Sequence, residues 1–244
     1  MSDPSILAVE AAPCVAIAIL VGKVAPFAPN GTRSAIAKRA VPSAIVTFSA
    51  VDGDERGDPK NHGGPEKVVH HYPVEHYRHW RAHGVASALL DTPGAFGENL
   101  TTVGMTEESI CVGDVYAVGR SGLRLQVSQV RQPCWKLNVR FDVPQMAANV
   151  QRACRTGWHY RVLHAGRLSV GDELVLLERP HPDWTLARLA SKLYVDTLDR
   201  PALEEIAHLR FLADSLKNVA RRRLETASIE SWERRLTGVE AEPG

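Results

Sequence analysis

The feature that most constrains this 244-residue chain is a change of pattern near residue 180. Before it, short apolar, β-branched runs alternate with turn residues, such as the Gly-Asp steps at 113–114 and 171–172. After it, leucines recur at helical spacing, as at Leu186, Leu189 and Leu193. Short strands separated by turns indicate a barrel or sandwich, and the leucine spacing indicates amphipathic helices. We therefore expect a mainly β domain followed by a small helical one.

The expected domains are residues 1–180 and 181–244, joined by a stiff link at Pro180 and Pro182. Short helices are expected at 73–84 and 143–157, because each opens with proline and closes at glycine. The first should carry His76 and His79 on an exposed face. The expected strands are 15–22, 44–48, 67–71, 110–118, 123–129 and 173–177, and the expected tail helices are 185–194, 200–210 and 212–226.

Composition excludes several classes of protein. The net charge is +1, from 29 basic and 28 acidic residues, which gives no argument for binding nucleic acid or an anionic membrane. The four cysteines are far apart, so neither a disulfide framework nor a paired-cysteine zinc site is indicated. The apolar run at 13–22 follows acidic rather than basic residues and is too short to span a membrane. We expect a soluble cytoplasmic protein with no membrane partner.

The segment VSQVRQPCWKLNVRF (127–141) is the strongest candidate site. Cys134 directly follows an alternating strand, in a position where an irregular backbone can present a thiol to a pocket. Arg131, Lys136 and Arg140 would favour the thiolate, which is both a nucleophile and a ligand for soft metals. The alternative is a buried packing cysteine beside Trp135.

Two glycine-rich segments could also approach a ligand. In GDPKNHGGPEKVVHHYP (57–73), the pair Gly63-Gly64 allows close backbone approach, and Asn61, His62 and Lys67 supply donors. The segment GAFGENLTTVG (94–104) adds Asn99. Plain turns explain both equally well. Zinc binding by the nearby histidines lacks an H-E-x-x-H motif, and a Cys–His hydrolase with His62 or His71 as base stays open.

Together and in order, these segments resemble the MOSC domain family, in particular its bacterial YiiM-type branch. The further matching stretches are GWHYRVLHAG (157–166) and GDELVLLERPHPDW (171–184). The resemblance covers roughly residues 40–180, and the helical tail is similar to the 3-alpha domain of that branch. It implies an α+β, mostly β fold: a MOSC-type β-barrel with flanking helices plus a small C-terminal three-helix bundle.

The same resemblance implies a function. MOSC proteins bind molybdenum cofactor, in which molybdopterin holds the metal, and in reducing members a cysteine adds a sulfur ligand. The matching residue is Cys134, as catalytic residue and metal ligand. The branch is associated with reducing N-hydroxylated bases such as hydroxylaminopurine to amines, with electrons from a partner reductase. The implied cofactor-binding residues are Ser34, Lys38, Asn61, His62, Gly63, Gly64, Lys67, Asn99, Arg131, Asn138 and Arg140. Val130 departs from the proline expected in close relatives.

Other functions stay open at this stage. Cys134 could instead carry sulfur as a persulfide, or the pocket could carry cofactor without turnover. The tail resembles a helix-turn-helix, but residues 185–244 hold ten Lys and Arg against ten Asp and Glu, so DNA binding is not favoured. Docking, homodimerisation or a lid over the pocket are the preferred roles for the tail.

Overall fold

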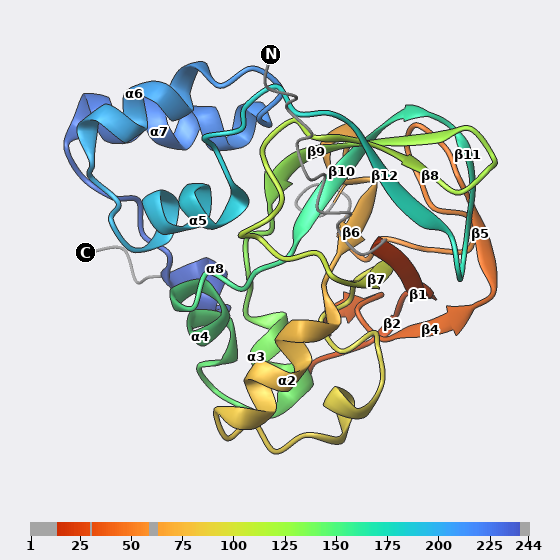
Figure 1. The fold of residues 1–244 in the computed structure, drawn as a ribbon. Coiled ribbons are helices and arrows are strands. Elements are labelled where there is room, and N and C mark those ends of the chain that lie inside the picture. Colours follow the sequence, from red (N-terminus) through yellow and green to blue (C-terminus); the bar gives the residue numbers. More distant parts are fainter. Residues whose placement is uncertain (1–13, 30, 59–62, 240–244) are drawn as a thin grey trace, which may run out of the picture.

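The structure is a computed structural model and describes residues 14–29, 31–58 and 63–239. Figure 1 shows a twisted barrel with helices on one side and at one end. The strands are β1 (Cys14–Gly22), β2 (Ala25–Pro26), β3 (Arg33–Ser34), β4 (Lys38–Val41), β5 (Ser43–Val46), β6 (Val69–His71), β7 (Leu100–Val103), β8 (Val115–Val118), β9 (Leu123–Val130), β10 (Trp158–His164), β11 (Gly166–Ser169) and β12 (Glu173–Glu178).

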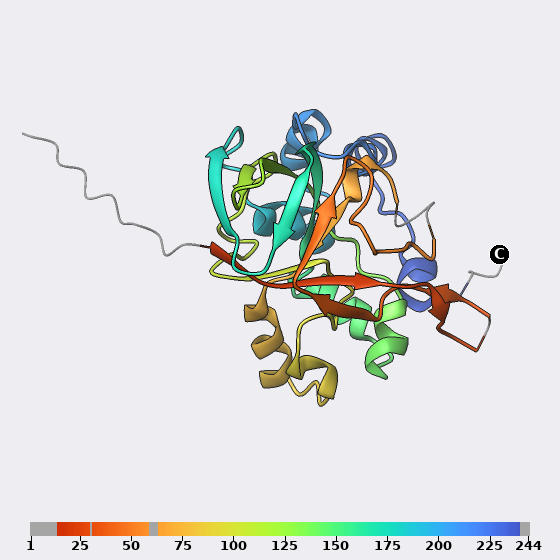
Figure 2. The same ribbon diagram turned by 90° about the vertical axis from the view of Figure 1, so that its right-hand side faces the viewer.

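The barrel is closed through its longest strand. The strand order is β12-β8-β9-β10-β6-β7-β1-β4, and a further pairing of β1 with β12 joins the two ends. β4 is therefore an extra strand attached to β1. A register shift between Ala16 and Ala18 bends β1, which lets one strand pair with both β7 and β12. Figure 2 shows β1 and β4 running across the lower edge of the barrel.

The barrel interior explains the alternating pattern of the sequence. On β9, Leu123, Leu125 and Val127 are fully buried in the main hydrophobic core. Burial of each such side chain contributes about 1.5–3 kcal/mol. Ser128, which follows Val127, has its hydroxyl within hydrogen-bond distance of two carbonyl oxygens, those of Glu66 at 2.6 Å and His159 at 2.9 Å. β9 is thus covered on both faces at its carboxyl end, where the candidate site begins.

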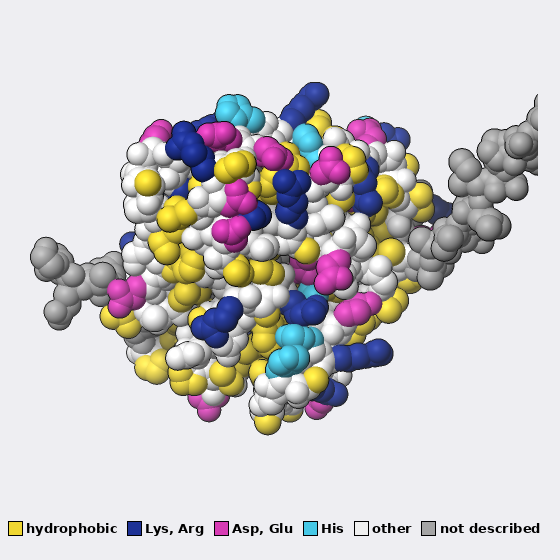
Figure 3. All heavy atoms as spheres, turned by 60° about the vertical axis from the view of Figure 1, so that its left-hand side comes forward, with side chains coloured by type: hydrophobic (Ala, Val, Ile, Leu, Met, Phe, Trp, Pro, Cys, Tyr) yellow, Lys and Arg dark blue, Asp and Glu magenta, His cyan; other side chains and the backbone are white. Residues whose placement is uncertain are grey.

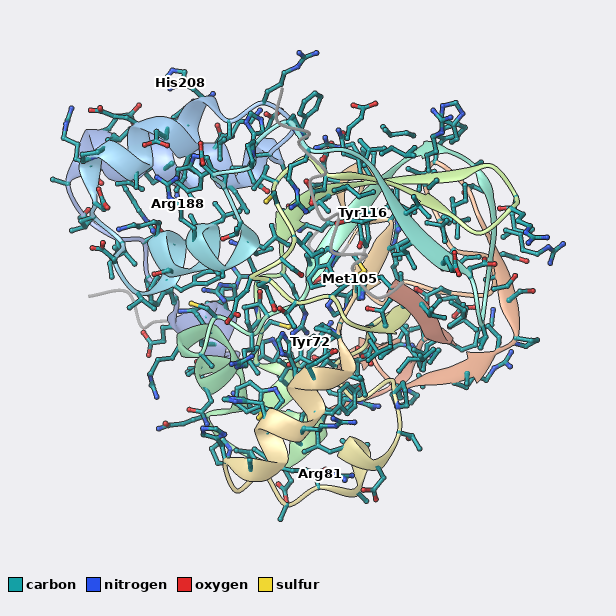
Figure 4. The ribbon with its side chains drawn as sticks, viewed as in Figure 1. Tyr72, Arg81, Met105, Tyr116, Arg188 and His208 are labelled. Carbon is teal, nitrogen blue, oxygen red and sulfur yellow. The ribbon has the colours of Figure 1, made fainter. Side chains whose placement is uncertain are left out.

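A second, smaller core lies below the barrel. It is formed by α2 (Val74–Ala82), α3 (Lys136–Phe141), α4 (Met146–Arg152) and the loop at 94–97, beside the short 3-10 helix η2 (Ala88–Asp91). At its centre, the rings of Tyr72 and Phe96 stack with centroids 4.0 Å apart. Figure 4 labels Tyr72 at the head of α2, with Met105 and Tyr116 nearer the barrel. This core fixes α3 and α4, the two helices that follow β9 in the chain.

The helical tail packs directly on the barrel. It comprises α5 (Leu186–Tyr194), α6 (Arg200–His208), α7 (Asp214–Thr226) and α8 (Glu233–Thr237). Side chains of Thr185 and Asp199 accept the capping hydrogen bonds that start α5 and α6. Leu186, Leu189 and Leu193 belong to the same buried cluster as the barrel interior. The barrel and the tail therefore share one continuous core.

The predicted fold class is confirmed: an α+β, mostly β protein with a barrel, flanking helices and C-terminal helices. Several elements differ in detail. The strand expected at 110–118 begins only at Val115, because Gly113 has φ +80 and the Asp114 carboxylate accepts the amide hydrogen of Cys111 at 2.9 Å. Helices α3 and α8 were not expected. Among the described residues, no helix is long and apolar enough to cross a membrane.

Candidate functional site

The loop carrying Cys134 connects β9 to α3. Pro133 has no amide hydrogen and so cannot continue a strand ladder. The carbonyl oxygen of Cys134 accepts the amide hydrogen of Leu137 at 2.9 Å, which starts the next helix. The Cys134 residue is buried, as the packing alternative predicted, and it lies in the irregular loop after the strand that the site hypothesis predicted.

The other three cysteines lie in settings that favour the neutral thiol. Burial raises the pKa of Cys14 and of Cys111. Burial, aided by the charge of Glu107, raises the pKa of Cys154 to about 11. A thiolate ligand requires the opposite environment, so none of these three competes with Cys134 for the role.

Two cations close to Cys134 in the sequence, Arg131 and Lys136, are buried. Arg131 is 8% exposed and Lys136 is 7% exposed. Within the described ranges, neither side chain forms an ion pair, and Nη1 of Arg131 is buried without a hydrogen-bond acceptor. A buried charge without a partner is costly, so this arrangement favours an anion at the site.

A second group of predicted residues meets at Asp54. Nζ of Lys38 lies 2.7 Å from the Asp54 carboxylate, and the Asn99 amide donates to the same oxygen at 2.9 Å. Asn99 also accepts the amide hydrogen of His70 at 3.1 Å. Burial lowers the pKa of Lys38, and the Asp54 charge opposes that effect. Asp54 thus keeps a lysine charged in the interior.

His70 lies close to both groups, the cations near Cys134 and the residues around Asp54. Its ring stacks on His159 with centroids 4.9 Å apart, and its Nε2 has no hydrogen-bond partner in the described part of the chain. Burial lowers the pKa of His70 well below its usual range, and the charges of His159, Arg131 and Lys38 add to this effect. The imidazole of His70 is therefore neutral, and the cations Arg131 and Lys38 lie within electrostatic range of it.

Gly157 packs closely against His70 and His71. Its φ is +69, and a Cβ there would lie 2.4 Å from the carbonyl oxygen of His71 and 3.2 Å from Nε2 of His70. Its carbonyl accepts the amide hydrogen of Arg131 at 2.9 Å. Only glycine allows β10 to start so close to β6 and the Cys134 loop.

Two predicted cofactor residues have their polar groups engaged within the protein. Asn138 donates to the carbonyl of Leu236 at 2.8 Å and accepts the amide hydrogen of Ala147 at 2.8 Å, which joins α3 to α8 and α4. Arg140 donates to the carbonyls of Gly94 and Ala95 and so fixes the loop before Asn99. The structure brings neither group toward His70.

The remaining predicted residues are spread over two segments. Ser34 is buried on β3, and its Oγ accepts the amide hydrogen of Ile36 at 3.2 Å. Gly64 has φ +99 and precedes the 3-10 helix η1 (Pro65–Lys67). Burial lowers the pKa of Lys67, and the charge of Asp58 opposes this. Gly63 lies next to this turn, whereas Asn61 and His62 lie outside the described residues.

The structure corrects one expectation and adds several residues. His76 is fully buried rather than exposed, and its Nε2 lies 2.6 Å from the Glu107 carboxylate. Asp54, His70 and His159 were not predicted as site residues. The sequence signal that could have indicated His70 is its position next to His71 on a strand, because neighbouring strand residues face opposite sides.

The donor set limits what the site can bind. Among the described residues, no three His, Cys, Asp or Glu side chains converge as metal ligands. A metal held by Cys134 would therefore take most of its ligands from a bound organic group. An anionic group bearing its own metal ligands fits the unpaired cations and the single thiol.

Comparison with known proteins identifies the family. Residues 58–175 match the MOSC domain, and residues 184–227 match the YiiM-like, 3-alpha helix domain. Protein YiiM of Escherichia coli (strain K12) is 35% identical over 221 residues, which cover 90% of this chain and 97% of that protein. The chain belongs to the YiiM-like MOSC proteins.

Two further comparisons concern a solved structure and a longer fungal relative. The crystal structure of YiiM from Escherichia coli has a TM-score of 0.75 at 29% identity, over 92% of this chain and 98% of that one. A protein of Gibberella moniliformis (strain M3125 / FGSC 7600) named "Reductase" is 36% identical over 217 residues, or 88% of this chain. The YiiM-like chain spans only 38% of the length of that relative.

MOSC is a molybdenum-cofactor-associated family. The matched MOSC segment contains His70, Asn99, Arg131 and Cys134, whereas Lys38 and Asp54 precede it.

Proposed function

We propose that this protein is a molybdenum-cofactor-dependent reductase of N-hydroxylated compounds, hydroxylaminopurine bases among them. The observation that carries the proposal is a buried Cys134 flanked in sequence by two buried cations, Arg131 and Lys136, neither of which forms an ion pair within the described residues. The cofactor combines a phosphate, which needs cations, with a metal that accepts a thiolate.

The residues present fit this cofactor. Arg131 offers a buried N–H without an acceptor, and His70 offers a buried ring nitrogen without a partner in the described part of the chain. Asn99 accepts the amide hydrogen of His70, and Lys38 lies within electrostatic range of the His70 ring. We propose that Arg131 and Lys38 hold the anionic part, that Asn99 orients it, and that Cys134 supplies the sulfur ligand.

When bound, the cofactor would supply the two-electron redox chemistry that converts N–OH to N–H. The balance is two electrons and two protons per N–OH group, with release of one water. The chain itself contributes the buried Cys134 sulfur within electrostatic range of Arg235, a neutral imidazole at His70 and a largely buried, water-poor setting. No described residue supplies the electrons, so we propose a separate electron-donating reductase as partner. The "Reductase" name of one relative supports this class of reaction.

Small molecules are the proposed substrates, and nucleic acid is not a proposed partner. Acidic and basic residues are nearly equal in number, 28 and 29. On the face shown in Figure 3, side chains of both signs are interspersed. Nucleic-acid binding relies on clustered basic residues that contact phosphates.

The proposal is tested by making wild type, Cys134→Ser and Cys154→Ser in a host that produces molybdenum cofactor. We expect near-stoichiometric molybdenum in wild type and in Cys154→Ser, and strong loss of metal in Cys134→Ser. Reduction of hydroxylaminopurine, with reduced viologen as electron donor, should follow the metal content.

Two results would contradict the proposal. Wild-type turnover in Cys134→Ser would remove this residue from the site. Bound metal without any turnover in wild type would instead indicate a protein that carries cofactor, and a persulfide on Cys134 would indicate a sulfur carrier.

A further inference from the structure

The last helix of the chain lies against the Cys134 loop. Nη1 of Arg235, on α8, donates to the carbonyl oxygen of Pro133 at 2.6 Å, and Nη2 donates to the Gln151 side chain on α4 at 2.6 Å. The carbonyl of Arg235 accepts the amide hydrogen of Trp135 at 2.8 Å. One residue of the tail thus contacts the loop on both sides of Cys134.

Neighbouring residues of α8 strengthen this contact. The carbonyl of Leu236 accepts a hydrogen bond from Asn138 at 2.8 Å. Gly238 lies directly against the indole of Trp135, because a Cβ there would be 2.9 Å from the ring. In Figure 1, α8 lies between α4 and α5, away from α6 and α7. A helix of this length is not stable alone, so these contacts account for its formation.

The connection from the three-helix part to α8 is itself fixed by buried groups. Arg223 on α7 is 2% exposed and donates to the carbonyl of Leu193 at 2.9 Å. The same guanidinium forms an ion pair with Glu230 at 2.7 Å, and Glu230 accepts a hydrogen bond from Trp232 at 2.9 Å. The segment that leads into α8 is therefore attached to the bundle just before the helix begins.

The guanidinium of Arg235 also lies within electrostatic range of Cys134. Burial lowers its pKa; Tyr194, Cys134 and Glu230 oppose that effect, while Arg131 adds to it. The two acceptors of its side-chain hydrogen bonds, the Pro133 carbonyl and the Gln151 amide, are neutral. Arg235 is thus a half-buried guanidinium close to the thiol.

We infer that α8 is part of the candidate site and that Arg235 is a positioning residue for the Cys134 loop. Arg235 holds the loop at Pro133 and Trp135, while Gln151 fixes the direction of its guanidinium. The matched YiiM-like 3-alpha helix domain ends at residue 227, so α8 lies beyond it. The inference concerns the loop itself and does not depend on the proposed redox chemistry.

The test is amide hydrogen exchange of peptides covering 131–141, measured on the full-length protein without added metal. In Arg235→Gln, which loses the bond to Pro133, we expect exchange in this segment to be about tenfold faster, the effect of losing one to two hydrogen bonds. Arg235→Lys should restore part of the protection, because its ammonium can still reach one carbonyl. Arg222→Gln, which removes an exposed arginine of α7, should exchange like wild type.

A truncation after Trp232 provides a second test. It removes α8 but keeps Glu230 and Trp232, so the buried Arg223 retains its ion pair. Peptides from the barrel, such as 123–130, should exchange at the wild-type rate while 131–141 exchanges faster. Metal bound by loaded protein should also dissociate faster from Arg235→Gln than from Arg222→Gln.

Two outcomes would overturn the inference. Unchanged exchange at 131–141 in Arg235→Gln would mean that α8 does not hold the loop. Equal acceleration in the barrel peptides and in 131–141 would mean that Arg235 only contributes to global stability. A protein that never binds molybdenum would refute the proposed function but leave this measurement decisive.

Discussion

The backbone N–H of Arg131 donates to the carbonyl oxygen of Gly157 at 2.9 Å, so the site loop and the start of β10 are directly joined. The N–H of Gly157 in turn donates to the buried carboxylate of Glu107 at 2.7 Å, and that carboxylate also lies 2.6 Å from Nε2 of His76. The buried His76–Glu107 pair therefore supports the candidate site from behind. The pair is connected to the site loop through Gly157.

Replacement of that glycine should be severe. Gly157→Ala forces a Cβ to within 2.4 Å of the carbonyl of His71 at a φ of +69. Gly171→Ala is the matched control, because Gly171 has φ +89 but nothing within 4 Å of its Cβ position. We expect the control to cost about 1–2 kcal/mol from its backbone conformation alone. Gly157→Ala should cost several kcal/mol more in urea unfolding; equal costs would show that β10 can move away.

Replacing Arg131 should leave the stability of the cofactor-free protein unchanged or raise it, but should weaken cofactor binding. Arg131→Met removes a buried charge with no acidic partner among the described residues, so the cofactor-free protein should be equally stable or more stable by up to about 4 kcal/mol. The same variant should retain less molybdenum when made in a competent host. Arg124→Met, at an exposed position of β9, is the control for both measurements. A large loss of stability in cofactor-free Arg131→Met would indicate a structural role instead.

Lys38 and Asp54 form a buried ion pair whose two side chains are 7% and 9% exposed. Lys38→Met leaves the Asp54 carboxylate buried without its cation, and we expect a loss of about 3–5 kcal/mol in the free energy of unfolding. The exposed pair Lys23–Glu55 offers a comparison, because Lys23→Met should cost only about 0–1 kcal/mol. Similar small losses in both variants would mean that water reaches Asp54.

Stability should fall in mildly acidic solution because of buried neutral histidines. Burial lowers the pKa of His71 well below its usual range, helped by the charge of His76, and the same holds for His70. Below about pH 6.5, the unfolded chain therefore binds protons that the folded protein excludes. The free energy of unfolding should be nearly constant above pH 6.5 and fall by about 2 kcal/mol between pH 6.5 and 5.5.

The source of that pH dependence can be checked by substitution. His71→Met should remove about half of the slope below pH 6.5, whatever its effect on absolute stability. His208→Gln, at an exposed position, should leave the slope unchanged. A slope that persists in full in His71→Met would assign the protons to other groups.

Much of the fold follows from local patterns in the sequence. The Gly-Asp turns and the leucine spacing of α5 agree with the structure. The alternation in β9 correctly predicts the buried Leu123, Leu125 and Val127, but Gln126 and Ser128 on the other face are buried as well. The helix at 136–141 was not predicted from such local patterns. This helix is short and is fixed by contacts of Asn138 and Arg140 with distant segments, which no local repeat reveals.

The sequence alone determined the barrel-plus-helices class and drew attention to Cys134 and its neighbouring cations, because burial periodicity, turn chemistry and motif composition are local properties. Only the tertiary structure decided which distant groups join Cys134. It brought Lys38 and Asn99 to Asp54 and His70, engaged Asn138 and Arg140 elsewhere, and returned Arg235 to the loop from about a hundred residues away in the chain. These choices depend on barrel closure and long-range packing, which are properties of the whole chain rather than of any one segment.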